Sequence, residues 1–117
     1  MRLNEISYND AAPVDGYGPG FFRIGGTKYD GAVAAFATGV KAWGGYEDTA
    51  TLLEQAETLD VLFVGTGAEV AHLPADFRTT LEDAGIGVEA MASPAACRTY
   101  NILLSEGRRV AIALIPV

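Results

Sequence analysis

The sequence predicts a mixed α/β fold in which N-terminal antiparallel hairpins join a parallel βαβαβ unit, giving three layers of sheet and helices. Between residues 21 and 43, short β-favouring runs alternate with turn residues, a pattern typical of antiparallel hairpins. Between residues 51 and 115, apolar strand-like runs alternate with helical segments, and strands joined in this way lie parallel. The length of 117 residues predicts a single domain that spans residues 1–117.

The hairpin half is marked by paired turn residues. Gly25-Gly26 and Asp30-Gly31 suit tight turns, because glycine adopts positive φ angles without steric cost. They predict three antiparallel strands, of which the third covers residues 32–43. Small apolar residues occupy both faces of this third strand, so we expect it to be covered on both sides.

The second half alternates helices and strands. In chain order, the expected elements are a short helix near residues 51–57, a strand at 61–64, a helix from Pro74 to Gly85, a strand at 86–91, a helix from Ser93 to Gly107 and a strand at 110–115. The proline at the start of the second helix and the glycine at its end follow the usual asymmetry of helix termini. The run Val61–Val64 is wholly apolar, which predicts a central strand covered on both faces.

The helix that begins at Ser93 carries most of the candidate binding residues. Ser93 is a favoured N-cap and Pro94 a favoured first helical residue, so two signals fix where the helix starts. At about 100° per residue, the apolar stripe through Tyr100 faces the core. Arg98 and Asn101 fall on the opposite side, which the sequence predicts to be available for binding.

A candidate anion site lies at the start of this helix. The loop Gly65–Gly67 follows the strand at 61–64 and ends at the same edge of the parallel sheet. Backbone N–H groups of the loop, the positive end of the helix and the Arg98 guanidinium could together hold an anion. The candidate binding residues are Gly65, Thr66, Gly67, Ser93, Cys97, Arg98 and Asn101.

Cys97 and its neighbours also have plainer interpretations. Near Arg98 and in the first turn of a helix, the Cys97 thiol could become a nucleophile, but the same position suits a small buried hydrophobe. A Cys–His pair would require His72, the sole histidine of the chain. Alternatively, Arg98, Tyr100 and Asn101 only join the helix to its neighbours. We therefore predict no catalytic residue.

Composition excludes several classes of protein. A formal charge of −7 disfavours nucleic acid, whose phosphates most of the surface would repel. The lone cysteine cannot form an internal disulfide, which favours a reducing compartment. No signal sequence opens the chain and no apolar stretch reaches the roughly 20 residues that span a bilayer. We expect a soluble, cytoplasmic protein without direct membrane insertion, and without a metal or cofactor, because the chain groups too few ligands.

Several motifs in order resemble one known family. They are Asp60–Gly67 (DVLFVGTG), Leu73-Pro74, Gly85–Met91 (GIGVEAM), Ala95–Leu103 (AACRTYNIL) and Glu106–Val110 (EGRRV). These segments are similar to a small-domain family of bacteria, archaea and mitochondria, long labelled as of unknown function, that includes mitochondrial complex I assembly factor three. The resemblance is specific over residues 60–115 and weaker over 21–43. It implies a compact three-layer fold and participation in building the respiratory NADH dehydrogenase.

Two functions follow as hypotheses. The resemblance predicts a non-enzymatic accessory protein that assists assembly of a respiratory NADH dehydrogenase, with complex subunits or assembly factors as its protein partners. The alternative is a binding protein or enzyme that holds an anionic small molecule in a pocket formed by the Gly65–Gly67 loop and the start of the Ser93 helix.

Overall fold

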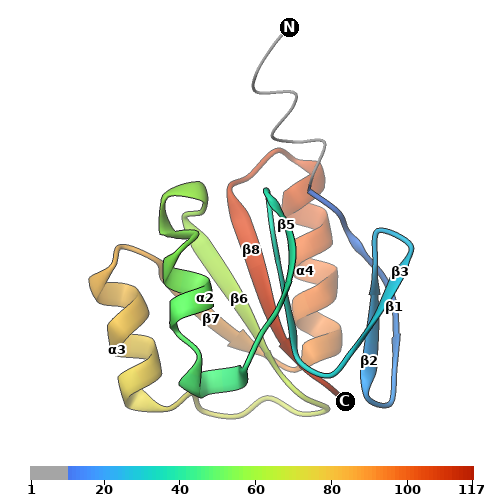
Figure 1. Ribbon diagram of the computed structural model, residues 1–117, viewed down its shortest axis with the longest axis horizontal. Coiled ribbons are helices and arrows are strands. Elements are labelled where there is room, and N and C mark those ends of the chain that lie inside the picture. The colour runs from blue at the N-terminus through green and yellow to red at the C-terminus, as the bar shows by residue number, and fades with distance from the viewer. Residues whose placement is uncertain (1–10) are drawn as a thin grey trace, which may run out of the picture.

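The computed structural model describes residues 11–117 and arranges them in three layers (Figure 1). The strands are β1 (Val14–Gly18), β2 (Phe21–Ile24), β3 (Thr27–Asp30), β4 (Val33–Phe36), β5 (Gly39–Ala42), β6 (Val61–Thr66), β7 (Gly87–Met91) and β8 (Val110–Ile115). The helices are η1 (Gly45–Glu47), α2 (Ala50–Leu53), η2 (Ala56–Thr58), α3 (Ala75–Asp83) and α4 (Ser93–Ser105), where η marks a 3-10 helix.

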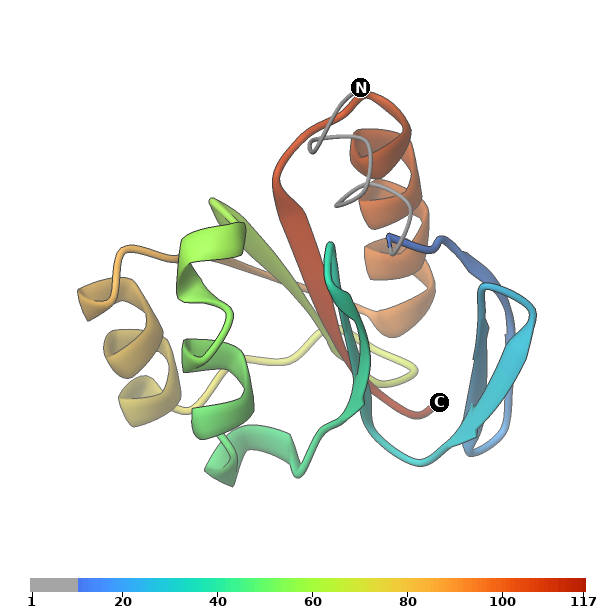
Figure 2. The same cartoon turned by 45° about the horizontal axis from the view of Figure 1, so that its top comes forward.

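The middle layer is a five-stranded sheet with the order β5-β4-β8-β6-β7. Helices α2 and α3 cover one face of this sheet, and α4 covers the other together with a separate sheet of order β1-β2-β3 (Figure 2). Strand β6 is central among the parallel strands, pairing with β8 on one side and β7 on the other. The predicted mixed α/β class, with antiparallel strands joined to a parallel βαβαβ unit, is confirmed.

The antiparallel half differs from the prediction in three respects. Strand β1, which precedes residue 21, was not predicted, and the expected third strand is two strands, β4 and β5, separated by a turn at Ala37-Thr38. The Gly25-Gly26 hairpin is confirmed, with φ angles of 58° and 84°. The Asp30-Gly31 hairpin is wrong, because there the chain passes from the small sheet into the five-stranded one. Strand β4 pairs with β8 and is buried along its whole length, so the expected coverage on both sides is confirmed for this part of the strand. It is wrong for β5, an edge strand whose residues are half-buried or exposed.

The helix expected near residues 51–57 is shorter and broken. Four residues form α2 and a 3-10 turn, η2, follows. The Asp48 carboxylate accepts the N–H of Thr51 at 3.1 Å and the Thr51 hydroxyl at 2.8 Å, so the side chain that caps this helix lies before it. Pro74 is the extended residue that immediately precedes α3, and Gly85, with φ of 88°, follows its last turn.

The core consists of two apolar clusters, one on each face of the five-stranded sheet. The cluster under α2 and α3 includes Leu62 and Val64, whereas Phe63 points to the cluster under α4 and the small sheet. This alternation along β6 is what a strand buried on both faces requires. The hairpin sheet contributes Phe22 and Ile24 to the second cluster, so it is packed into the fold through side chains of β2.

Among residues 11–117, no helix has both the length and the apolar character that crossing a bilayer needs.

Candidate functional site

The structure separates the seven predicted binding residues into two groups. Gly65, Thr66, Gly67 and Ser93 meet at a buried corner, where β6 ends and α4 begins. Cys97, Arg98 and Asn101 lie further along α4 and line a groove beside β1.

At the corner, Ser93 connects three segments through hydrogen bonds and is not an N-cap. Ala92 occupies the cap position with an extended backbone, and Ser93 is the first helical residue, fully buried. The Ser93 hydroxyl accepts the N–H of Gly67 at 2.9 Å and donates to the carbonyl of Ile115 at 2.7 Å. The N–H of Ser93 donates in turn to the Gly67 carbonyl at 2.8 Å. One side chain therefore ties the β6 loop, α4 and the end of β8 together.

Gly65 allows this close approach of helix and strand. A Cβ at Gly65 would lie 2.6 Å from the Ser93 Oγ and 2.7 Å from a methyl carbon of Leu114. The Thr66 hydroxyl is also engaged, because it accepts the N–H of Ala71 at 3.1 Å and lies 2.7 Å from the Glu69 carbonyl. The Gly67 N–H is therefore not free for an anion, so the expectation of free backbone N–H groups in the loop is wrong at Gly67. The Ser93 hydroxyl is engaged as well.

The second group lines what we call the β1–α4 groove, with a volume of about 330 Å³. Its walls are Val14, Asp15, Gly16 and Tyr17 from β1, and Pro94, Cys97, Arg98 and Asn101 from α4. The groove lies between strand β1 and helix α4.

Asn101 holds β1 against α4. Its amide oxygen accepts the N–H of Val14 and its amide nitrogen donates to the Val14 carbonyl, both at 2.8 Å. The Tyr100 hydroxyl adds a bond to the Ala12 carbonyl at 3.0 Å. Asn101 was expected on an available helix face. Instead it agrees with the alternative interpretation, in which these residues join the helix to its neighbours.

The Cys97 thiol lies at the floor of the groove and is 4 % exposed. Burial raises its pKa from 9.0 to about 11, against a smaller opposing effect of the Arg98 charge. The thiol therefore stays protonated at neutral pH, which favours the interpretation of a small buried hydrophobe over that of a nucleophile.

Arg98, one residue further, is exposed and has no ion pair or side-chain hydrogen bond to any other residue in the described part of the chain. Ile102 lies one turn beyond it on the same helix and is 57 % exposed.

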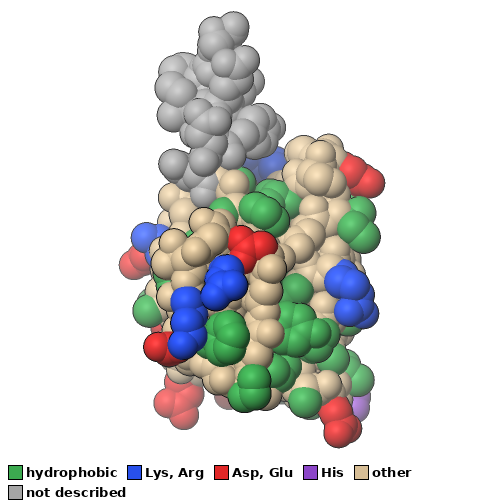
Figure 3. Space-filling view, turned by 90° about the vertical axis from the view of Figure 1, so that its right-hand side faces the viewer, with side chains coloured by type: hydrophobic (Ala, Val, Ile, Leu, Met, Phe, Trp, Pro, Cys, Tyr) green, Lys and Arg blue, Asp and Glu red, His purple; other side chains and the backbone are tan. Residues whose placement is uncertain are grey.

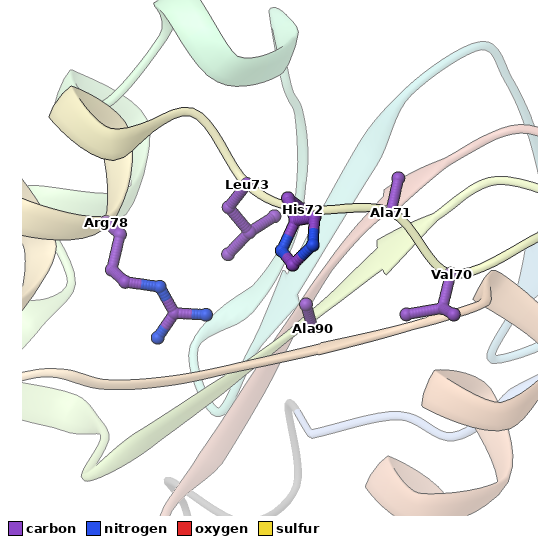
Figure 4. Close-up of a pocket in the computed structure, with 6 residues that line it drawn as sticks. All are labelled: Val70, Ala71, His72, Leu73, Arg78 and Ala90. Carbon is purple, nitrogen blue, oxygen red and sulfur yellow. The ribbon is translucent and has the colours of Figure 1, made fainter.

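His72 belongs to a different pocket, of about 260 Å³, which the sequence did not predict (Figure 4). Its other walls are Val70, Ala71, Leu73, Arg78 and Ala90, and Cys97 is not among them, so His72 and Cys97 do not line a common pocket. The Arg78 guanidinium donates to the Val88 carbonyl at 3.1 Å and pairs with Glu82 at 3.2 Å. No sequence motif indicates this pocket, because its walls come from the loop before α3, from α3 and from β7, which only the fold brings together.

No group of three or more His, Cys, Asp or Glu side chains in residues 11–117 is arranged to hold a metal ion. The fold and the groove together define a small α/β domain whose most distinctive surface is a strand–helix groove with an exposed arginine.

Comparison with known proteins places this domain in a family. A family model described as "Protein of unknown function (DUF498/DUF598)" matches residues 14–115, and the chain belongs to that family. An uncharacterized protein of Rhodobacter capsulatus is 44% identical over 100% of this chain and 94% of its own length. The NADH dehydrogenase (ubiquinone) 1 alpha subcomplex assembly factor 3 of Danio rerio is 37% identical over 86% of this chain. The chain spans 62% of the length of that assembly factor.

Solved structures agree with the fold. The crystal structure of an outer membrane protein from Bartonella henselae has a TM-score of 0.83 at 34% identity, over 92% of this chain and 97% of the other. A protein from Bordetella parapertussis has a TM-score of 0.77 at 39% identity over the same shares.

Proposed function

We propose that this protein is a non-enzymatic accessory protein that assists assembly of a respiratory NADH dehydrogenase by binding its subunits or its assembly factors. The observation that carries the proposal is the 37% identity to the Danio rerio assembly factor, which extends over 86% of this chain. The family match covers residues 14–115, and this range contains both the buried corner at Ser93 and the β1–α4 groove.

The surface of α4 supports docking as the mode of action. Arg98 and Ile102 are exposed on neighbouring turns of α4. Within residues 11–117, Arg98 forms no ion pair and Ile102 is not a core residue. Tyr17 of β1, on the other side of the groove, is 46 % exposed. Aromatic and arginine side chains are the types that most often dominate the binding energy at protein interfaces.

The proposal is tested by purifying the tagged full-length chain from its own organism at native level and identifying bound proteins by mass spectrometry. Arg98→Ala is compared with the wild type, and Arg108→Ala is the matched control because it removes the same charge just beyond the end of α4. We expect NADH dehydrogenase subunits or assembly factors with the wild type and the control, and less of them with Arg98→Ala. Reproducible recovery of no respiratory protein would contradict the proposal.

A second candidate function, binding of an anionic small molecule, is favoured by the pocket in Figure 4. The His72 ring and the Arg78 guanidinium come from a loop and from α3, and they converge on the same cavity above Ala90. Stabilisation of the fold by phosphate or citrate in a thermal unfolding assay, lost in His72→Ala, would support this function. No stabilisation by either anion would exclude both of them as ligands.

A further inference from the structure

We propose that the β1–α4 groove binds an extended acidic segment of a partner protein, which pairs with the open edge of β1 and places a carboxylate against Arg98. This inference rests on the proposed function and deepens it, because it states what the protein partner must present. Three features of the molecule support it: the hydrogen-bonding state of the β1 edge, the distribution of charge, and the side chains that flank the groove.

Within residues 11–117, strand β1 lies at the edge of its sheet and pairs with β2 alone. The register joins Gly18 to Phe21 across a two-residue turn, and Tyr17 to Phe22. In such a hairpin the pair next to the turn exchanges hydrogen bonds, and the following pair points its N–H and C=O groups outward. The backbone groups of Tyr17 therefore face away from β2, toward the side on which the groove lies.

The same edge already makes strand-like hydrogen bonds at Val14. A bulge between Val14 and Gly16 changes the alternation, so Val14 also faces outward. There the Asn101 amide binds both the N–H and the C=O of Val14, as a neighbouring strand would. No side chain or loop in the described residues does the same for the Tyr17 backbone. Asn101 thus closes one end of the edge and leaves the other end for a partner strand.

Charge is unequally distributed along the chain and hence between the layers. Residues 44–91, which include α2, α3, β6 and β7, contain ten Asp and Glu against one Arg. Residues 11–43 and 92–117, which build the small sheet, α4, β4, β5 and β8, contain six Lys and Arg against three Asp and Glu. The segments that form the groove therefore carry a net positive charge within an acidic protein, although Arg109 is paired with Asp60 and Lys28 with Asp30. The excess of carboxylates belongs to the other segments, so an acidic segment meets less repulsion at the groove than elsewhere.

The side chains that flank the groove suit an amphipathic strand. Arg98 offers a planar guanidinium that forms no ion pair among the described residues, and Arg–carboxylate pairs form two parallel hydrogen bonds. The one carboxylate in the groove wall, Asp15, accepts the N–H of Gly26 at 2.7 Å. Tyr17 and Ile102 are exposed apolar contacts on the two sides. Figure 3 shows hydrophobic side chains gathered between Lys and Arg side chains on this side of the molecule. A strand with alternating acidic and apolar residues matches these features.

The test selects peptides from a displayed library of random 12-residue sequences against the full-length chain, and measures the binding of synthetic versions by fluorescence anisotropy. We expect the enriched peptides to contain Asp or Glu alternating with apolar residues. Arg98→Glu should weaken binding at least about tenfold, the effect of losing one charge-assisted pair, whereas Arg108→Glu should change it less than about twofold. N-methylation of peptide backbone nitrogens should weaken binding at alternate positions, because only every second N–H faces β1.

The N-methylated peptides test strand pairing without altering the protein. Enrichment of basic peptides, equal binding by Arg98→Glu, or N-methylation without a two-residue period would each overturn the inference. A dimer in light scattering that Arg98→Glu dissociates would assign the groove to a second copy, and binding of phosphatidylglycerol vesicles in place of peptides would assign it to lipid; either would also overturn it. The peptide selection uses no respiratory protein, so it tests the groove separately from the assembly role. It can succeed when the affinity purification fails, and it can fail when the affinity purification succeeds.

Discussion

The fold depends on the two hydrogen bonds of the Ser93 hydroxyl, which Ser93→Ala removes. The hydroxyl bonds the Gly67 N–H at 2.9 Å and the Ile115 carbonyl at 2.7 Å in a fully buried position. Each lost bond costs about 1 kcal/mol, and an unsatisfied buried N–H adds about 1–3 kcal/mol. We expect the free energy of unfolding to fall by about 3–5 kcal/mol, measured by urea unfolding followed through the fluorescence of Trp43, the only tryptophan.

Ser93→Asp separates this role from that of an N-cap. Aspartate caps helices as well as serine does, so a capping Ser93 would tolerate the change. At the buried corner, a carboxylate would lose its hydration and face the Ile115 carbonyl, and we expect Ser93→Asp to be less stable than Ser93→Ala. Ser105→Ala is the control, because its exposed hydroxyl bonds only the Ile102 carbonyl of its own helix. A loss below about 1 kcal/mol for Ser93→Ala, with Ser93→Asp near the wild type, would refute the reasoning.

Three further predictions concern the same elements. Gly65→Ala should destabilise by about 1–3 kcal/mol in urea unfolding, because its Cβ would overlap Ser93 and Leu114, and an unchanged midpoint would contradict the packing described. Asn101→Ala should cost about 1–2 kcal/mol and speed hydrogen exchange of the β1 amide it binds, and unchanged exchange would show that the edge is held otherwise. Burial raises the pKa of Cys97 from 9.0 to about 11, so the unfolded chain loses this proton first and stability should fall as pH rises from about 9 to 11. Cys97→Ala should flatten this fall, and an equal pH dependence in the variant would contradict it.

The parallel half of the fold could be predicted because its signals are local. The apolar run of β6, the glycine that ends α3 and the alternation of helix and strand each point to one structure. Strand β1 was missed because Asp15, Gly16 and Gly18 are residues that strands usually avoid. The switch of sheets at Asp30-Gly31 depends on the pairing of β4 with β8, about 80 residues away, which turn chemistry cannot reveal.

The candidate site was predicted in part, because helix periodicity alone does not show which other elements cover a helix. The helix periodicity correctly indicated that Arg98 is exposed, but the same periodicity placed Asn101 on an available face. In the structure β1 covers that position. Because β1 was not predicted, its contact with Asn101 could not be predicted either. A serine followed by proline can be an N-cap or the first helical residue, and the sequence does not distinguish the two. The hydrogen bond from Ser93 to the end of β8 therefore could not be predicted before the position of β8 was known.

The proposed role is assistance in assembling a respiratory NADH dehydrogenase through the α4 side of the groove. The most direct measurement is the amount of assembled enzyme, on native gels and as NADH oxidation by membranes, in cells that lack the protein and are complemented with the wild type, Arg98→Glu or Arg108→Glu. We predict low assembled enzyme in the deletion strain, restored by the wild type and by Arg108→Glu but not by Arg98→Glu. Normal levels of assembled enzyme in the deletion strain would contradict the claim.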